Sequence, residues 1–256
     1  MINARLLFAL CLVATGCDAQ TPNASAKATI STLNPANVSL VARDGVRIFG
    51  TFYESRGRAR AIILQFHQAG SNKAEYKTIA PKLAEAGFAV LAIDQRSGGR
   101  NFGANNETVD LLGQSRDYLA AKPDLEAAIA WASAKKLPII IWGSSYSAAL
   151  VYLVASEKPD KVVAALAFSG GNYLGGDRVT AAARTIAIPV FATSAKSEVA
   201  KMRPILDNAR STNKVFFVPM GPSAHGSSAL IAEKNPGGTE EIWAAVFAFL
   251  NSIEKG

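Results

Sequence analysis

Three serines lie close together at the end of an apolar run, in the stretch "IIIWGSSYSAALVYLVA" from Ile139 to Ala155. A strand that ends in glycine and passes through serine into a helix is typical of a nucleophile elbow, G-x-S-x-G. Counted from Gly143, this pattern makes Ser145 the nucleophile and places Ser147, also a small residue, where the second glycine usually stands. The alternative is a serine-rich turn in which a hydroxyl group caps the helix.

A serine hydroxyl is a weak nucleophile unless a base accepts its proton. The chain contains two histidines, and both follow an expected strand. His225 lies in "GPSAHGSS", in the last loop before the C-terminal helix, so we expect it to be the general base. His67 lies in "QFHQAGSN", directly after an earlier strand. A lone histidine is more often a surface or structural residue, and the order Ser145…His225 favours the base.

The elements that must position these residues alternate along the chain from about residue 37. Apolar runs separated by helical patterns predict an α/β fold with about eight strands, mostly parallel, covered by helices on both faces. The first two strands, around the turn at Arg43 to Gly45, are expected to be antiparallel. A long polar loop is expected at residues 95–122 and a final helix around Ile242 to Leu250. Expected strands include residues 60–66, 88–94, 137–142, 161–168, 188–193 and 214–219.

Length and composition agree with one large domain. The chain has 256 residues, and 49% of them are hydrophobic, which is enough for a sizeable core. The 27 Lys and Arg residues exceed the 20 Asp and Glu residues, which gives a formal net charge of +7, but they are scattered, so we expect no nucleic-acid partner. No cluster of His, Asp, Glu or Cys has the spacing of metal ligands, so neither a metal nor a cofactor is expected.

The first residues read as a secretory leader. An apolar stretch from Leu6 to Val13 follows Arg5 and is too short to span a bilayer. The "ATGC" that follows resembles a bacterial lipobox, which would make Cys17 the lipidated N-terminus; the alternative is cleavage after Ala19. We therefore expect a signal peptide at 1–16, a flexible tether at 17–36 and a domain at 37–256, held in the periplasm by a lipid or secreted.

Taken together, the elbow, the loop after the third strand and the late "AHG" resemble the α/β-hydrolases over about residues 37–254. The chain looks most like dienelactone hydrolase-like and monoacylglycerol lipase-like serine esterases. In such families the loop after the third strand carries "HGxG", whose third residue donates a backbone N–H to the oxyanion. The resemblance assigns that role to Ala69, together with the N–H of Tyr146. Gln68 replaces the usual glycine and is an alternative donor, and His67 becomes a structural residue.

The acid is where the chain departs from this pattern. Related sequences have an Asp in a stretch like "G-x-K-D-E" after the seventh strand, whereas this chain reads "SAKSEVA". Ser197 occupies the Asp position and Glu198 follows it. Three possibilities remain open: Glu198 supplies the carboxylate, Asp177 supplies it from after the sixth strand, or no carboxylate orients His225.

The resemblance implies a serine hydrolase that cleaves small or exposed carboxylic esters through an acyl-enzyme. Ser145, His225 and Glu198 would be catalytic, and a small-molecule ester would be the partner. The alternative is a binding or scaffolding lipoprotein that has this fold and no activity, because a fold alone does not determine function.

Overall fold

A computed structural model describes Met1 and residues 34–253 of the chain. The predictions of a leader, of lipidation at Cys17 and of most of the tether concern residues outside this part. The first strand begins at Ala36, one residue before the expected start of the domain. Within the described residues, no helix is both long enough and apolar enough to cross a membrane.

The domain is built on an eight-stranded sheet with the spatial order β1-β2-β4-β3-β5-β6-β7-β8. The first two strands pair antiparallel with each other, β2 pairs antiparallel with β4, and the remaining neighbours are parallel. The expected mostly parallel sheet is therefore confirmed. The strands are β1 (Ala36–Val41), β2 (Arg47–Tyr53), β3 (Ile62–Phe66), β4 (Ala89–Asp94), β5 (Ile139–Ser144), β6 (Ala164–Phe168), β7 (Val190–Thr193) and β8 (Lys214–Phe217).

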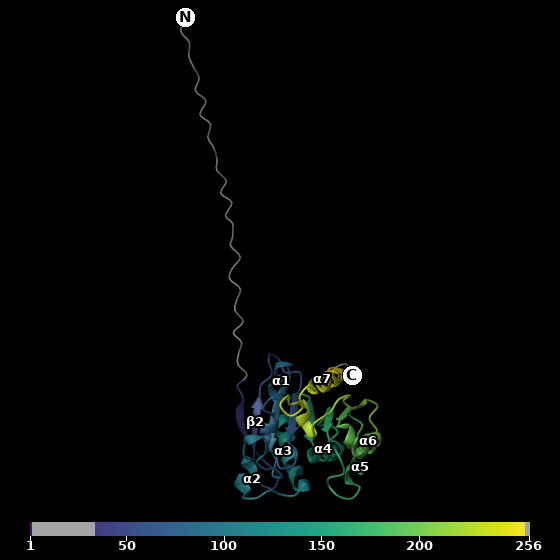
Figure 1. Cartoon of the computed structure of the whole chain (residues 1–256). Helices are drawn as coiled ribbons and strands as arrows, with labels where there is room; N and C mark the ends of the chain where they lie inside the picture. Colours follow the sequence, from purple (N-terminus) through teal and green to yellow (C-terminus); the bar gives the residue numbers. More distant parts are fainter. Residues whose placement is uncertain (2–33, 254–256) are drawn as a thin grey trace. The chain divides into compact units, whose positions relative to one another are not determined.

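Central strands are buried on both faces because helices cover the sheet on each side (Figure 1). One core cluster lies between the sheet and α3, α4, α5 and α6, and the other lies between the sheet and α1 and α7. The helices are α1 (Ile79–Glu85), α2 (Glu107–Leu112), α3 (Lys122–Ser133), α4 (Tyr146–Glu157), α5 (Arg178–Ala183), α6 (Val199–Asp207) and α7 (Thr239–Ile253).

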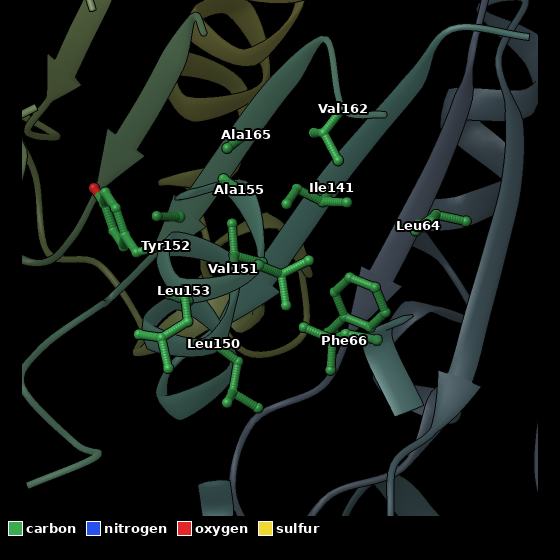
Figure 2. Close-up of a cluster of buried hydrophobic side chains, with 14 of the residues drawn as sticks. Leu64, Phe66, Ile141, Leu150, Val151, Tyr152, Leu153, Ala155, Val162 and Ala165 are labelled. Atoms are coloured by element: carbon green, nitrogen blue, oxygen red, sulfur yellow. The ribbon is translucent and has the colours of Figure 1, made fainter. Parts of the chain in front are cut away.

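Helix α4 is the most deeply buried of these elements, and it is the helix that follows Ser145. Ten of its twelve residues are buried, so it is apolar nearly all round, as expected for a core helix. Figure 2 shows Val151 of α4 beside Ile141 of β5, in a cluster of buried side chains that also contains Leu150 of α4 and Phe66 of β3. This packing fixes the start of α4 relative to the ends of β3 and β5.

The long loop expected at residues 95–122 is only partly correct, since it contains the short helix α2. The side chain of Asn106 accepts a hydrogen bond from Val109 N at the start of this helix, and Gly113 ends it with φ 72°. The capping residues were present in the sequence, but the six residues between them are too few to show an apolar period.

Candidate active site

The turn between β5 and α4 has the sharp geometry of an elbow. Ser145 stands alone between the two elements, with φ 59° and ψ −120°, a region that residues other than glycine seldom occupy. Its N–H donates to Phe168 O at 2.8 Å, which ties the turn to β6. A Cβ on Gly143 would lie 2.3 Å from the carbonyl oxygen of Ser147, so this turn requires glycine there.

The three serines of this turn have different surroundings. Ser144 Oγ accepts a hydrogen bond from Ser227 N at 2.9 Å, and Ser147 Oγ donates to His67 O at 2.6 Å. Both of these side chains are fully buried, whereas Ser145 retains 7% exposure. Ser144 and Ser147 therefore make hydrogen bonds within the fold, and Ser145 is the one of the three that remains partly accessible.

The predicted acid, Glu198, and the predicted base, His225, are in contact. His225 Nδ1 lies 2.5 Å from Glu198 Oε1, and their side chains are 40% and 20% exposed. Burial raises the pKa of Glu198, but the hydrogen bonds from His225 and Ser169 outweigh it, so the pKa lies below its ordinary value. Glu198 is thereby kept ionised. Asp177, the alternative acid, is exposed at the start of α5 and lies 3.8 Å from Arg184.

The local backbone explains why Glu198, and not Ser197 before it, contacts His225. Residues Lys196–Glu198 form a short 3₁₀ helix directly after β7. Because such a helix has three residues per turn, neighbouring side chains point in different directions. Ser197 is exposed, whereas Glu198 turns inward to His225.

The loop that carries His225 packs tightly against the elbow. Gly226 has φ 64°, and a Cβ there would lie 2.3 Å from Ser144 Oγ. Ser227 Oγ also accepts a hydrogen bond from Trp142 Nε1 at 2.9 Å. These contacts bring His225 to the edge of the sheet where Ser145 lies, although the structure of residues 34–253 contains no hydrogen bond between the two side chains.

Gln68 and Ala69, two of the three residues predicted as oxyanion donors, lie in the loop after β3. The N–H of Gln68 donates to Glu75 Oε2 at 2.8 Å and is therefore engaged within the fold. The Gln68 side chain donates to Ser228 Oγ at 3.3 Å. Ala69 follows in the loop, and Tyr146 is the first residue of α4, where the N–H groups have no partner in the preceding turn of helix.

His67 is fully buried in this loop and has partners on both ring nitrogens. Its Nε2 accepts from Gln95 N at 3.0 Å, which leaves the proton on Nδ1, 2.9 Å from Gln68 O. Burial lowers the pKa of His67, which keeps the ring neutral. His67 thus joins the β3 loop to the β4 loop.

Four residues near the site were not singled out from the sequence. Tyr118 stacks on Tyr146 with ring centroids 4.4 Å apart, and the Tyr173 hydroxyl donates to Ser169 O at 3.4 Å. Ser169 Oγ donates to Glu198 Oε2 at 2.7 Å, and the fourth residue is Glu75. Of these four residues, only Ser169 could have been recognised from the sequence, because it directly follows an apolar strand, as Ser145 and His67 do. The part of the chain that the structure describes has no group of three or more metal-ligating side chains.

Comparison with known proteins supports the same fold. Residues 57–215 match the family described as serine aminopeptidase, S33. Among solved structures, a dienelactone hydrolase from Anabaena variabilis is similar at 18% identity and a TM-score of 0.67, over 86% of this chain and 98% of the other. An esterase from Pyrococcus furiosus has 17% identity and a TM-score of 0.68, over 87% and 92%.

A monoacylglycerol lipase from Paleococcus ferrophilus is similar at 14% identity and a TM-score of 0.61, over 80% of this chain and 99% of the other. No curated protein matches the sequence. These likenesses and the sheet order confirm the predicted α/β-hydrolase fold, and residues 34–253 contain no large lid domain.

Proposed function

This chain belongs to the serine aminopeptidase S33 family of hydrolases, and on that premise we propose that it is a serine esterase. In this proposal Ser145 is the nucleophile, His225 the general base and Glu198 the residue that orients His225. Backbone N–H groups of Ala69 and Tyr146 bind the oxyanion. No metal or cofactor takes part.

Acylation proceeds as follows in this scheme. Ser145 Oγ attacks the carbonyl carbon of the ester, and its proton passes to His225 Nε2. The tetrahedral oxyanion accepts hydrogen bonds from the two N–H groups, which stabilise charge that develops in the transition state. His225 then returns the proton to the leaving alkoxide as the carbon–oxygen bond breaks, which releases the alcohol and leaves an acyl-enzyme.

Deacylation repeats the same proton transfers with water. A water molecule gives a proton to His225 and attacks the acyl carbon, and His225 returns the proton to Ser145 Oγ as the acid leaves. Glu198 remains ionised throughout and stabilises the imidazolium. Its lowered pKa is consistent with that role, because a carboxylate that became protonated could not balance the charge of His225.

The observation that carries the proposal is the hydrogen bond between Glu198 and His225 Nδ1 beside a strained Ser145. A binding protein has no need of a carboxylate on Nδ1, of an ionised Glu198 or of a serine with φ 59°. Substrate size follows from the connection between β6 and β7, which contains only the six-residue α5. We infer that the acyl group is small or lies exposed at the surface.

Hydrolysis of a short-chain aryl ester by serine variants tests this proposal. Ser145→Ala should abolish hydrolysis, whereas Ser144→Ala and Ser147→Ala should retain most of it, because their hydroxyl groups are bonded within the fold. Equal losses in all three variants, or no loss in any, would contradict the assignment. Aminoacyl anilides, assayed in parallel, distinguish an esterase from the peptidase that the family description names.

The alternative function is a binding or scaffolding protein without activity. It predicts that the wild-type protein and all three serine variants are equally inactive on every acyl substrate.

We also propose that Cys17 is lipidated and anchors the protein in the bacterial cell envelope. The lipobox-like residues before Cys17 support this proposal. In that case Cys17→Ser should move the protein from the membrane fraction to the soluble fraction. Unchanged membrane association would contradict it.

A further inference from the structure

Ser169 is the first residue after β6 and is held in an unusual backbone conformation. Its φ is 50°, in the left-handed region that favours glycine, and its side chain is buried. The N–H of Ser169 donates to Thr193 O at the end of β7, at 2.8 Å. Two neighbouring strands therefore fix the place from which this side chain starts.

The hydroxyl group of Ser169 makes two hydrogen bonds in opposite senses. It donates to Glu198 Oε2 at 2.7 Å, and it accepts from Gly226 N at 2.8 Å. Glu198 uses its other oxygen, Oε1, to contact His225 Nδ1 at 2.5 Å. One hydroxyl group is therefore bonded both to the acid and to the residue that directly follows the base.

A glutamate at this place needs such a second anchor. Glu has one more side-chain torsion than the Asp of the family pattern that the sequence resembles, and Glu198 stands one residue after that Asp position, which Ser197 occupies. Its side chain is still 20% exposed, so without a partner on Oε2 the carboxylate is able to turn toward solvent. A hydrogen bond to an ionised group is stronger than one between neutral groups, which makes the Ser169 hydroxyl an effective restraint.

We propose that Ser169 is a positioning residue that holds Glu198 and the His225 loop in the arrangement that orients the base. The proposal rests on the assignment of Glu198 and His225 as acid and base. Ser169 itself touches neither substrate nor the reacting atoms. It acts by keeping Oε1 of Glu198 on Nδ1 of His225.

Two variants separate the hydroxyl group from the strained backbone. Ser169→Ala removes the hydroxyl and keeps a residue that is unfavourable at φ 50°, whereas Ser169→Gly removes it and tolerates that φ. If the hydroxyl matters, both should lower kcat about 10- to 100-fold, as the loss of a hydrogen bond to a charged group does, with little change in KM. If Ser169→Ala does not fold, the glycine variant carries the test.

Ser211 supplies a matched control. It is also buried, its hydroxyl donates to Asn213 O at 3.0 Å and accepts from Asn213 N at 3.2 Å, and it lies in the connection before β8. Ser211→Ala therefore loses a donor and an acceptor bond of a buried serine without touching Glu198 or His225. It should retain the kcat of the wild-type protein.

NMR of the protein with nitrogen-15-labelled histidine reports directly on the hydrogen bond at His225 Nδ1, which would not change if Ser169 only stabilised the fold. The chain has only two histidines, so the signals are assigned with His225→Ala, and His67 serves as the internal reference. The Nδ1 proton of His225, bonded to Glu198, should shift or broaden in both Ser169 variants, while the His67 signals stay in place. An unchanged kcat in both variants, or a His225 Nδ1 signal that does not respond, would overturn the proposal.

This experiment also separates two failures. If Ser145→Ala still hydrolyses esters, the proposed function fails, yet the NMR signal of His225 still reports whether Ser169 positions Glu198. If Ser145→Ala is inactive and the Ser169 variants are fully active, the proposed function stands and the positioning role is wrong.

Discussion

The two histidines of this chain occupy similar places and have opposite environments. Each lies beyond a strand at the same edge of the sheet, His67 after β3 and His225 after β8. His67 is fully buried and both of its ring nitrogens face backbone groups. The side chain of His225 is 40% exposed, and its Nδ1 faces the carboxylate of Glu198. The partners of a histidine, more than its place in the fold, distinguish a structural ring from a base.

The surroundings of His67 show what a structural site needs. Asn106 Nδ2 donates to Gln95 O at 2.8 Å, and Ser147 Oγ donates to His67 O, so neighbouring loops are joined by backbone acceptors. Nearby, Asp94 Oδ1 accepts from Lys73 N at 2.7 Å. Most of the polar groups named here make hydrogen bonds to other groups of the fold. In the His225 region, our proposal assigns the Nε2 atom of His225 and the Ser145 hydroxyl group to the reaction with the substrate.

Replacing each histidine by alanine tests this contrast with the largest expected effect. His225→Ala should lower kcat by about 10⁶-fold, as loss of the base does in serine hydrolases, with the fold intact. His67→Ala should instead destabilise the protein by about 3 kcal/mol, since Gln95 N and Gln68 O lose a buried partner. Ester hydrolysis and urea unfolding of both variants provide the measurement. The contrast would be wrong if His67→Ala lost as much kcat per folded molecule as His225→Ala.

Glu198→Gln is expected to have the next largest effect. It removes the negative charge that stabilises the imidazolium, so kcat should fall by about 10⁴-fold with little change in KM. Steady-state kinetics on an aryl ester measure both parameters.

Ser197→Asp is the matched variant, since it introduces the Asp of the family pattern that the sequence resembles. With Glu198 already in contact with His225, the added carboxylate should be neutral or harmful. Near-normal kcat in Glu198→Gln together with a large gain in Ser197→Asp would refute the triad and leave a Ser145–His225 dyad.

A second pair, Glu75 and Glu198, extends the comparison to two carboxyl groups whose pKa values are shifted in opposite directions, upward for Glu75 and downward for Glu198. Burial raises the pKa of Glu75 from 4.5 to about 7, although the Ser144 hydroxyl and the Gln68 N–H favour the charged form. The folded protein thus binds a proton that the unfolded chain releases, so its stability falls as the pH rises from about 4.5 through 7.

Glu75→Gln removes this titration. Relative to the wild type, the variant should gain up to about 3 kcal/mol of unfolding free energy between pH 5 and pH 8. Urea unfolding at the two pH values measures the gain, and Glu85→Gln, at an exposed position, is the control. A difference between variant and wild type that did not depend on pH would contradict the raised pKa.

Ser147→Ala is expected to give the smallest effect. It leaves His67 O and the Gln95 side chain without a partner in the buried network, at a cost of about 2 kcal/mol. Because the Ser147 hydroxyl bonds only to His67 O and the Gln95 side chain, kinetic assays should find kcat retained, and thermal unfolding should show the loss of stability. A loss of kcat without a loss of stability would place Ser147 in the catalytic group instead.

Sequence reasoning reached the fold and the succession of strands along the chain because the central strands are nearly continuous apolar runs separated by helical patterns. It missed α2, whose six residues are too few for an apolar period, and it left the acid open among Glu198, Asp177 and none. That choice depends on which way side chains turn in a short 3₁₀ helix, which residue types alone do not determine. It also missed Ser169 and Glu75, whose partners are 29 and 7 residues away in the chain.

Covalent labelling with a fluorophosphonate probe tests the central claim most directly, since such a probe reacts with an activated serine and not with an idle one. The account predicts one adduct per chain on Ser145, found by peptide mass mapping, that disappears in Ser145→Ala and forms far more slowly in His225→Ala. His67→Ala, where folded, should still be labelled. No adduct on the wild-type protein, or labelling of Ser145 at the same rate in His225→Ala, would contradict the claim that His225 activates Ser145.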